Sequence, residues 1–283
     1  MKIAVFPKTC AQAGIPVMDA FIKSISNENY QIYENHERPE ADVVVIWSVL
    51  LNLYNRKPIY DYYSKKGTKL LVLEVGGIQR NRSWRIGING INRDAQYGNT
   101  DVDDTRLERL GLSLSPWKQG NDIIICTQNE NSAAWPDIKM TDWVENTVKW
   151  IRSQTTRRIW IRPHPRHRLN FDRLANNVDD LNICIPKHTG NKDEVDFKKY
   201  LSNAFAVVNY NSNPAIESVL AGVPVFVDKS SLCWPVGNAI GGDIEKPIMP
   251  DRTKWLQELS YCEWFVDEIE KGLPWARIKP LIK

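Results

Sequence analysis

Residues 209–226 constrain the fold more than any other part of this 283-residue chain. The apolar run at 206–208 leads into them and is typical of a buried strand. Pro214 suits the first position of a helix, and Gly222 suits the position just after its end. Residues 223–227 then read as a second strand. A strand, a helix and a strand in such close succession predict a β–α–β unit, the building block of a parallel sheet.

The polar loop of this unit, with Ser212 and Asn213, comes directly before the predicted helix. Free N–H groups and the helix dipole point at such a loop, so it suits an anion such as phosphate. Glu217, about one turn into the helix, can accept hydrogen bonds from the vicinal hydroxyls of a ribose. The loop and Glu217 together predict half of a nucleotide site. The alternative is a helix capped by Ser212 or Asn213, with no ligand.

The rest of the chain alternates strand and helix patterns, which predicts an α/β protein with parallel sheets. Strands are expected at residues 3–6, 43–47, 69–75, 122–127, 158–162 and 182–185, and helices at 15–25, 59–65, 141–151 and 194–202. Residues 78–120 interrupt the pattern and are expected to form an ordered but irregular functional loop region. Two domains are therefore expected, at residues 1–119 and 120–252, followed by helices at 253–283 that pack back on the first domain.

Composition narrows the class of protein. Hydrophobic residues make up 42% and charged residues 25%, as in soluble globular proteins. We expect no membrane span, because no apolar run approaches the ~20 residues that cross a bilayer, and the odd number of scattered cysteines favours a reducing, cytoplasmic location. The five cysteines are scattered without a CxxC pair, which argues against a disulfide framework or a zinc site. A net charge of +3 neither requires nor excludes a polyanionic partner.

A second polar group follows the strand expected at 158–162. Pro163 and Pro165 hold His164 in an extended turn, with Arg162 and Arg166 on either side. Arginine offers a fork of donors and histidine a single donor, a combination that suits phosphate. The alternative is a surface turn whose basic residues are incidental.

Polar residues follow two further strands of the second half. Lys187 and His188 come after the strand at 182–185, and Gln128 comes after the strand at 122–127. The carboxyl ends of neighbouring parallel strands meet at one crevice, where open α/β sheets bind ligands. We therefore expect these residues to converge with the preceding groups on a nucleotide, with Gln128 meeting its base or its phosphates.

Glu74 is the corresponding candidate in the first half. It lies at the carboxyl end of the strand expected at 69–75, just before Gly76 and Gly77. A carboxylate there can act as a general base on an acceptor hydroxyl. The alternative is a salt bridge to Arg80 or Arg82.

The chain contains one possible metal-binding motif and lacks several common catalytic and nucleotide-binding motifs. Residues 101–104 contain a DxD pattern, which either binds a divalent metal or is simply solvated. The chain has no GxGxxG, GxxxxGK[ST], HExxH or GxSxG motif. Classical dinucleotide, P-loop, metalloprotease and α/β-hydrolase sites are therefore not supported.

The His164-Pro165 motif and the Ser/Asn loop with Glu217 resemble the donor-binding motifs of GT-B glycosyltransferases, in particular the bacterial Kdo- and sialyl-type transferases of capsule synthesis. The resemblance covers roughly residues 120–230. It implies two facing Rossmann-like domains with parallel sheets, and an active site in the cleft between them. It also implies transfer from a nucleotide-sugar donor, with a UDP-sugar as the first choice and no obligatory cofactor or metal.

The stretch from Glu74 to Arg80 is similar to an acidic-acidic-Gly segment, followed by Arg, in the same enzymes. Val75 occupies the second acidic position here. The resemblance implies that Glu74 is the catalytic carboxylate, with Asp94 and Asp104 as substitutes.

The short chain and its basic loop also resemble phage-encoded transferases that add sugars to hydroxymethylated DNA bases. That resemblance implies a DNA acceptor and a place in the host cytoplasm. Arg80, Arg82 and Arg85 would hold the backbone while Trp84 packs against a base or sugar, and the target base would leave the stack. The alternatives are a transferase acting on a capsule-type polysaccharide or other glycan, and a non-catalytic module that binds nucleotides or nucleic acid.

Overall fold

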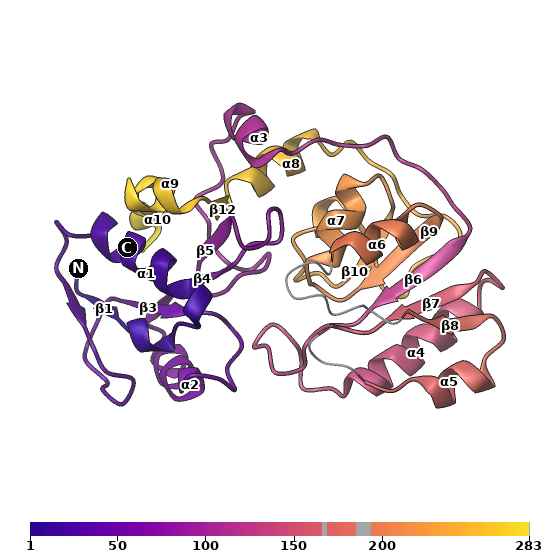
Figure 1. The fold of residues 1–283 in the computed structure, drawn as a ribbon, viewed down its shortest axis with the longest axis horizontal. Coiled ribbons are helices and arrows are strands. Elements are labelled where there is room, and N and C mark those ends of the chain that lie inside the picture. The colour runs from indigo at the N-terminus through magenta and orange to yellow at the C-terminus, as the bar shows by residue number, and fades with distance from the viewer. Residues whose placement is uncertain (166–168, 185–193, 283) are drawn as a thin grey trace. The chain divides into compact units, whose positions relative to one another are not determined.

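A computed structural model of the chain describes residues 1–165, 169–184 and 194–282. It contains two compact units, each built on a six-stranded sheet of described residues (Figure 1). Unit 1 comprises Met1–Leu112, Asn131–Ala134 and Thr253–Lys283, and unit 2 comprises Ser113–Glu130 and Trp135–Arg252. The predicted α/β class, with two Rossmann-like units, is confirmed.

The sheet of unit 1 has the order β12-β5-β4-β3-β1-β2. Its strands are β1 (Ile3–Val5), β2 (Tyr30–Ile32), β3 (Val43–Trp47), β4 (Lys69–Val75), β5 (Trp84–Ile88) and β12 (Glu263–Trp264). Its helices are α1 (Ile15–Ser24), α2 (Arg56–Lys66), α3 (Thr105–Leu110), α8 (Thr253–Ser260), α9 (Val266–Glu270) and α10 (Leu273–Ile278). The first four strands of the chain run parallel, whereas β5 and β12 are antiparallel to their neighbours.

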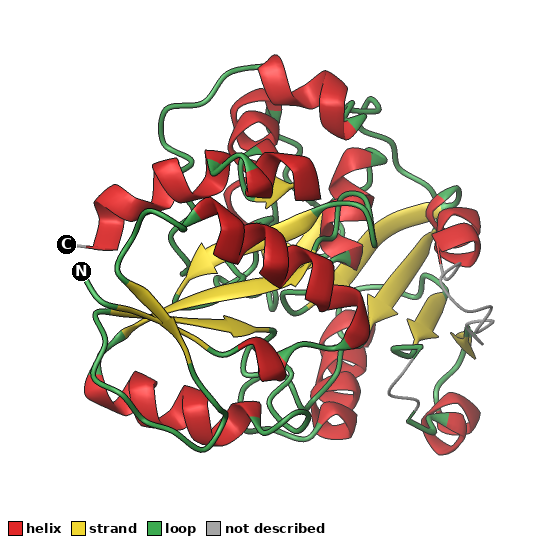
Figure 2. Cartoon of the chain, turned by 60° about the vertical axis from the view of Figure 1, so that its left-hand side comes forward, coloured by secondary structure: helices red, strands yellow, loops and turns green. Residues whose placement is uncertain are grey.

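Both faces of this sheet are covered by helices (Figure 2). Side chains alternate along β1, so that Ile3 and Val5 pack in the cluster with α1, while Ala4 and Phe6 pack in the cluster with α2. A strand that is buried on both faces needs apolar residues at every position. The continuous apolar run of β3 meets this requirement, since all of its residues are buried.

The sheet of unit 2 has the order β11-β10-β9-β6-β7-β8 and is parallel throughout. Its strands are β6 (Asp122–Cys126), β7 (Ile159–Arg162), β8 (Leu181–Ile183), β9 (Ala204–Asn209), β10 (Val225–Val227) and β11 (Asn238–Ala239). Its helices are α4 (Met140–Arg152), α5 (Asp172–Asn177), α6 (Glu194–Leu201) and α7 (Pro214–Leu220). Helices α4 and α5 lie on one face, and α6 and α7 on the other (Figure 1). Because the chain proceeds outward in both directions from β6, the strand order reverses between β6 and β9.

The expectation that residues 78–120 are irregular throughout is wrong, because β5 and α3 lie within them. The strand was missed because Arg85 and Gly87 interrupt its short apolar pattern. Arg85 is nevertheless buried, since its guanidinium pairs with the carboxylate of Glu263 at 2.7 Å. That partner lies 178 residues further along the chain, so a local pattern cannot reveal it.

The Glu263 carboxylate organises the turn after β4. It is fully buried and accepts hydrogen bonds from Gly77 N at 2.7 Å, Ile78 N at 3.0 Å and Ser83 Oγ at 2.7 Å, besides Arg85. A Cβ atom at Gly76 would overlap this carboxylate, so the turn needs glycine there. The C-terminal strand β12 is therefore an integral part of unit 1.

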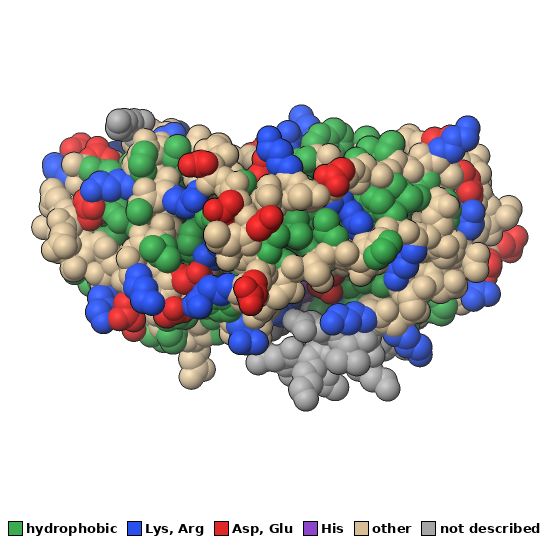
Figure 3. All heavy atoms as spheres, turned by 90° about the horizontal axis from the view of Figure 1, so that it is seen from above, with side chains coloured by type: hydrophobic (Ala, Val, Ile, Leu, Met, Phe, Trp, Pro, Cys, Tyr) green, Lys and Arg blue, Asp and Glu red, His purple; other side chains and the backbone are tan. Residues whose placement is uncertain are grey.

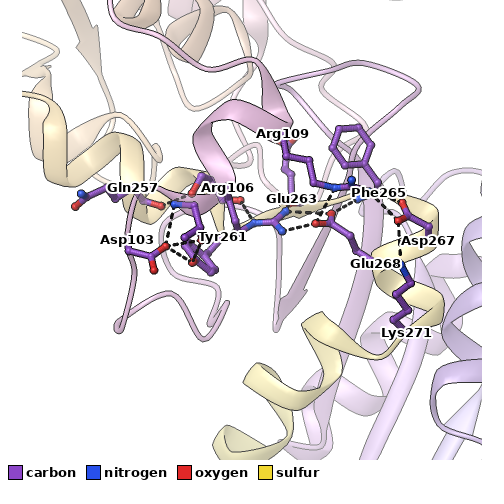
Figure 4. Close-up of polar contacts among 12 residues, drawn as sticks. Asp103, Arg106, Arg109, Gln257, Tyr261, Glu263, Phe265, Asp267, Glu268 and Lys271 are labelled. Atoms are coloured by element: carbon purple, nitrogen blue, oxygen red, sulfur yellow. Dashed lines mark hydrogen bonds and ion pairs between the residues drawn. The ribbon is translucent and has the colours of Figure 1, made fainter.

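A second polar network joins α3 to the C-terminal segment (Figure 4). Arg106 donates to both carboxylate oxygens of Glu268, at 2.6 and 3.2 Å, and to the backbone oxygen of Glu263 at 2.6 Å. Its guanidinium carbon lies 3.8 Å from the ring centroid of Trp264. Arg109 pairs with Asp267 at 2.7 Å on the exposed side of this network. The buried contacts hold the segment against α3.

Two further features complete the description. All five cysteine side chains are buried. Among the described parts of the chain, no helix has the length and apolar character needed to cross a membrane.

Replacing Glu263 by glutamine should lower the free energy of unfolding by about 3–5 kcal/mol, because Arg85 would keep a buried charge without its counter-ion. Urea denaturation measures this change. The control is Asp267→Asn, which removes the exposed partner of Arg109 and should cost at most about 1 kcal/mol. Equally small losses in both variants would contradict a structural role for the buried pair.

Candidate functional site

Polar residues gather at the carboxyl ends of four neighbouring parallel strands in unit 2. They follow β10, β9, β6 and β7 in the order of the sheet: Asp228 and Ser230, then Asn209 to Asn213, then Thr127 and Gln128, then His164. The strand order reverses within this group. Such a switch point is where open α/β sheets form a ligand crevice.

Asn209, the last residue of β9, fixes the loop that follows. Its side chain is fully buried, and its Nδ2 donates to Cys126 O at 3.1 Å and to Ser212 Oγ at 2.9 Å. Its Oδ1 accepts a hydrogen bond from Ser212 N at 2.8 Å. Asn213 occupies the N-cap position of α7, but no side chain makes the capping bond there. The side-chain capping bond that the alternative expects is therefore not formed at this N-cap.

A chain of hydrogen bonds links the ends of β6, β9 and β10. The Oε1 atom of Gln128 accepts from Asn211 N at 3.3 Å, and Asn211 Nδ2 donates to Ser230 Oγ at 2.9 Å. Ser230 Oγ donates in turn to Asp228 Oδ1 at 2.6 Å. Gln128 and Asn211 are 5% and 8% exposed, so these two amides are buried and hydrogen-bonded at this edge of the sheet.

Arg162 and His164 are fixed beside β6. Arg162 lies opposite Cys126 in the register of β6 and β7, and His164 N donates to Thr127 Oγ1 at 2.8 Å. The Arg162 guanidinium carbon lies 4.8 Å from the ring centroid of Phe197. Burial raises the pKa of the Cys126 thiol to about 12, Arg162 opposes this rise, and Glu217 adds to it. Arg162 and Glu217 are therefore both within electrostatic range of the same thiol.

The structure thus brings together the predicted donor residues that it describes. Gln128, Arg162, His164, Ser212, Asn213 and Glu217 all lie at or just beyond this edge of the sheet. Three others, Arg166, Lys187 and His188, fall outside the described residues. Sequence reasoning missed Asn209, although a polar residue at the end of an apolar strand was a visible signal.

Glu74 is the penultimate residue of β4 in unit 1 and is half-buried. Its Oε2 accepts hydrogen bonds from Ser48 Oγ at 2.6 Å and Val49 N at 3.2 Å, and its Oε1 accepts from Val75 N at 2.9 Å. Burial lowers the pKa of the Arg56 guanidinium, and the nearby charge of Glu74 partly opposes this shift.

The salt bridge considered as the alternative role of Glu74 is absent. Within the described ranges, Glu74 forms no ion pair with Arg80 or Arg82. The carboxylate is held by a hydroxyl and backbone N–H groups instead.

The other carboxylates proposed for catalysis lie elsewhere in unit 1. Asp94 is exposed in the segment between β5 and α3. Asp104 is the exposed N-cap residue of α3, and its Oδ1 accepts a hydrogen bond from Gln257 Nε2 at 2.9 Å. Neither lies on a parallel strand, in contrast to Glu74. No group of His, Cys, Asp and Glu able to hold a metal ion occurs among the described residues.

The assignment of Trp84 and Arg85 to an acceptor surface is wrong. Both belong to β5, and their side chains are only 5% and 3% exposed. The Arg85 charge is used inside unit 1 by Glu263. Arg80 is half-buried and Arg82 exposed in the turn before β5, so these two keep accessible side chains.

Comparison with solved structures finds the same fold in two enzymes of Thermosulfurimonas dismutans. The first is described as KpsC, beta Kdo 2,7 transferase, with a TM-score of 0.56 and 16% identity, covering 100% of this chain and 100% of that one. The second is described as KpsC, beta Kdo 2,4 transferase, with a TM-score of 0.54 and 12% identity, covering 97% of this chain and 98% of that one.

A UDP-GlcNAc 2-epimerase from Methanocaldococcus jannaschii matches with a TM-score of 0.36 and 12% identity over 91% of this chain and 98% of that one, too weakly to establish a shared fold. No protein-family model matches the sequence. No curated protein matches it either. The resemblance to Kdo-type transferases is confirmed in the fold, whereas no match reported above is to a transferase that acts on DNA. The chain therefore has the GT-B fold, with two Rossmann-like α/β units.

Proposed function

We propose that this chain is a glycosyltransferase that moves a sugar from a nucleotide-sugar donor to a hydroxyl group of a glycan. The observation that carries the proposal is the convergence of amide, basic and acidic side chains at the switch point of the unit 2 sheet. The two solved structures with this fold are described as Kdo transferases, which makes Kdo the first candidate sugar.

The donor would be held at the carboxyl edge of unit 2. Arg162, His164, Ser212 and Asn213 would contact its phosphate, and Glu217 would accept hydrogen bonds from its ribose hydroxyls. Phosphate binding at this position would depend mainly on the converging side chains. The dipole of α7 would contribute little, because the helix has only seven residues. Cationic groups at the phosphate stabilise the departing nucleotide, where negative charge develops in the transition state. This would make a metal ion unnecessary.

Three basic residues complete the proposed donor set. In the sequence, Arg166 follows β7, as His164 does, whereas Lys187 and His188 follow β8, the neighbouring strand of the sheet. Gln128 would meet the base or the phosphates, because it is anchored between β6 and β9.

Glu74 would act as the general base. In the transfer, the acceptor oxygen bonds to the anomeric carbon of the sugar, and the bond from that carbon to the phosphate oxygen breaks. The nucleotide leaves with the bonding electrons, and the acceptor proton passes to Glu74. Glu74 is favoured over Asp94 and Asp104 because its carboxylate is held by three hydrogen bonds at the end of a parallel strand.

A glycan acceptor is favoured over DNA for two reasons. Trp84 and Arg85, half of the residues proposed to hold DNA, are buried. On the face drawn in Figure 3, the coloured Lys and Arg side chains are interspersed with Asp and Glu. Binding to a DNA backbone requires several phosphate contacts from clustered cations.

Donor binding can be tested by a thermal-shift screen against uridine, cytidine and guanosine nucleotide sugars, including nucleotide-activated Kdo. At a concentration about 100 times its Kd, the correct donor should stabilise the folded state by about 2.7 kcal/mol. Glu217→Ala and Gln128→Ala should lose most of this shift and the turnover of donor to free nucleotide. Glu145→Ala is the matched control, because this exposed residue lies on α4 of the same unit. Equal responses of Glu217→Ala and Glu145→Ala would contradict the donor site.

Acceptor choice can be tested by offering a donor found in that screen with either Kdo-terminated oligosaccharides or duplex DNA that contains hydroxymethylcytosine. Transfer to the oligosaccharide is expected, with no transfer to DNA. If DNA were the acceptor, its affinity would fall steeply with salt, and Arg80→Ala with Arg82→Ala would reduce the salt slope by about 2. Donor binding without any turnover would instead favour a non-catalytic nucleotide-binding module.

A further inference from the structure

Ser48, the residue after β3, has an unusual backbone. Its φ angle is +67°, in the left-handed region that residues other than glycine rarely adopt. Other described non-glycine residues with positive φ are exposed or half-buried, whereas Ser48 is only 1% exposed (the others are Tyr54, Asn55, Asn81, Asn89 and Asp180). Unfavourable backbone conformations persist where the surroundings enforce them, and they cluster at functional sites.

A turn alone does not require serine at this position. Glycine adopts positive φ without steric cost and is the default choice for such a turn. Serine adds a hydroxyl, and both of its hydrogen-bonding roles are used. Ser48 Oγ donates to Glu74 Oε2 at 2.6 Å and accepts from Leu50 N at 3.1 Å. The left-handed backbone thus places a hydroxyl between the end of β4 and the turn after β3.

The buried side chain of Arg56 also contacts the turn after β3. Its guanidinium donates from Nε to Thr9 O at 2.8 Å and from Nη1 to Leu50 O at 2.9 Å. This buried cation also interacts electrostatically with Glu74. The turn that presents Ser48 is therefore braced by the buried guanidinium of Arg56.

The Glu74 carboxylate accepts three hydrogen bonds, one fewer than it can accept. A carboxylate has about four positions at which it accepts hydrogen bonds. Ser48 Oγ and Val49 N occupy those of Oε2, and Val75 N occupies one of Oε1. Among the hydrogen bonds of the described residues, Oε1 keeps one accepting position.

We propose that Ser48 is a positioning residue that immobilises Oε2 of Glu74, so that Oε1 is the oxygen that takes the proton of the acceptor hydroxyl. This inference rests on the proposed function, because it assigns Glu74 the role of base. Ser48 itself touches neither substrate nor nucleotide in this scheme.

The test compares Ser48→Ala with Ser48→Gly. The alanine variant keeps a side chain in the strained backbone and loses the hydroxyl, whereas the glycine variant loses the hydroxyl and the strain together. A role limited to the turn predicts opposite effects, with glycine tolerated and alanine harmful. A positioning role predicts the same loss in both, with kcat lower by up to about 100-fold and KM nearly unchanged. Asn55→Gly is the control, since it relaxes an exposed residue with a φ of +52° in the following segment.

The pH dependence gives a second measurement. Loss of a hydrogen bond to the ionised carboxylate disfavours that form, so the acid limb of the kcat/KM profile should move to higher pH in both Ser48 variants. Asn55→Gly should keep the wild-type limb. Wild-type kcat and an unmoved limb in Ser48→Ala and Ser48→Gly, beside an inactive Glu74→Gln, would overturn the role of Ser48 and leave the proposed function intact.

A spectroscopic measurement tests the role of Ser48 separately from the proposed transferase function. The ¹³C resonance of the Glu74 side-chain carboxyl, assigned by its loss in Glu74→Gln, should shift in both Ser48 variants and stay unchanged in Asn55→Gly. An unchanged resonance in the Ser48 variants would overturn the inference whether or not the chain has transferase activity. A full wild-type rate in Glu74→Gln would overturn both the base and its positioning residue.

Discussion

The buried carboxylate of Glu263 is the interaction on which the arrangement of unit 1 depends. It receives one charged donor and three neutral donors, all from the turn after β4 and from the start of β5. A buried charge is tolerated only when it is paired and its lone pairs are satisfied, and this carboxylate meets both conditions. Because Glu263 belongs to β12, the C-terminal segment fixes the turn that begins two residues after Glu74.

Unit 2 solves a similar problem with a neutral side chain. Asn209 ends a fully buried strand and uses its amide to satisfy the carbonyl of Cys126 and both the N–H and the hydroxyl of Ser212. An amide suits this position because it both donates and accepts, which neither a carboxylate nor an apolar side chain can do. The polar loop after β9 is thus held in place by the last residue of the strand itself.

Sequence patterns predicted the parts of the fold that depend on local order. The apolar runs of β3, β4 and β9 are long or bounded clearly enough to be read as buried strands, and Gly222 marked the end of α7. The patterns failed where burial depends on a distant partner. Arg85 looks like a surface residue until Glu263 is known to lie opposite it, and this is why β5 was read as a basic loop.

The same distinction applies to the candidate site. The convergence of the described candidate donor residues could be predicted because each one follows a recognisable strand, and parallel strands bring their carboxyl ends to one edge. The role proposed for Ser48 could not be predicted, because a single serine directly after the apolar residues of β3 forms no recognisable sequence motif. Its significance lies in a positive φ angle and in a contact across β3 and β4, and both are properties of the folded chain.

Glu74 and Glu263 illustrate how surroundings assign different roles to the same side chain. Each oxygen of Glu263 accepts two hydrogen bonds, so the carboxylate has no position left for a proton from a substrate. It is also fully buried, and protonation would abandon the Arg85 charge. Glu74 is half-buried and accepts one hydrogen bond fewer, so a proton can reach it without breaking an existing contact. Of these two carboxylates near one turn, only Glu74 has the accepting capacity that a general base requires.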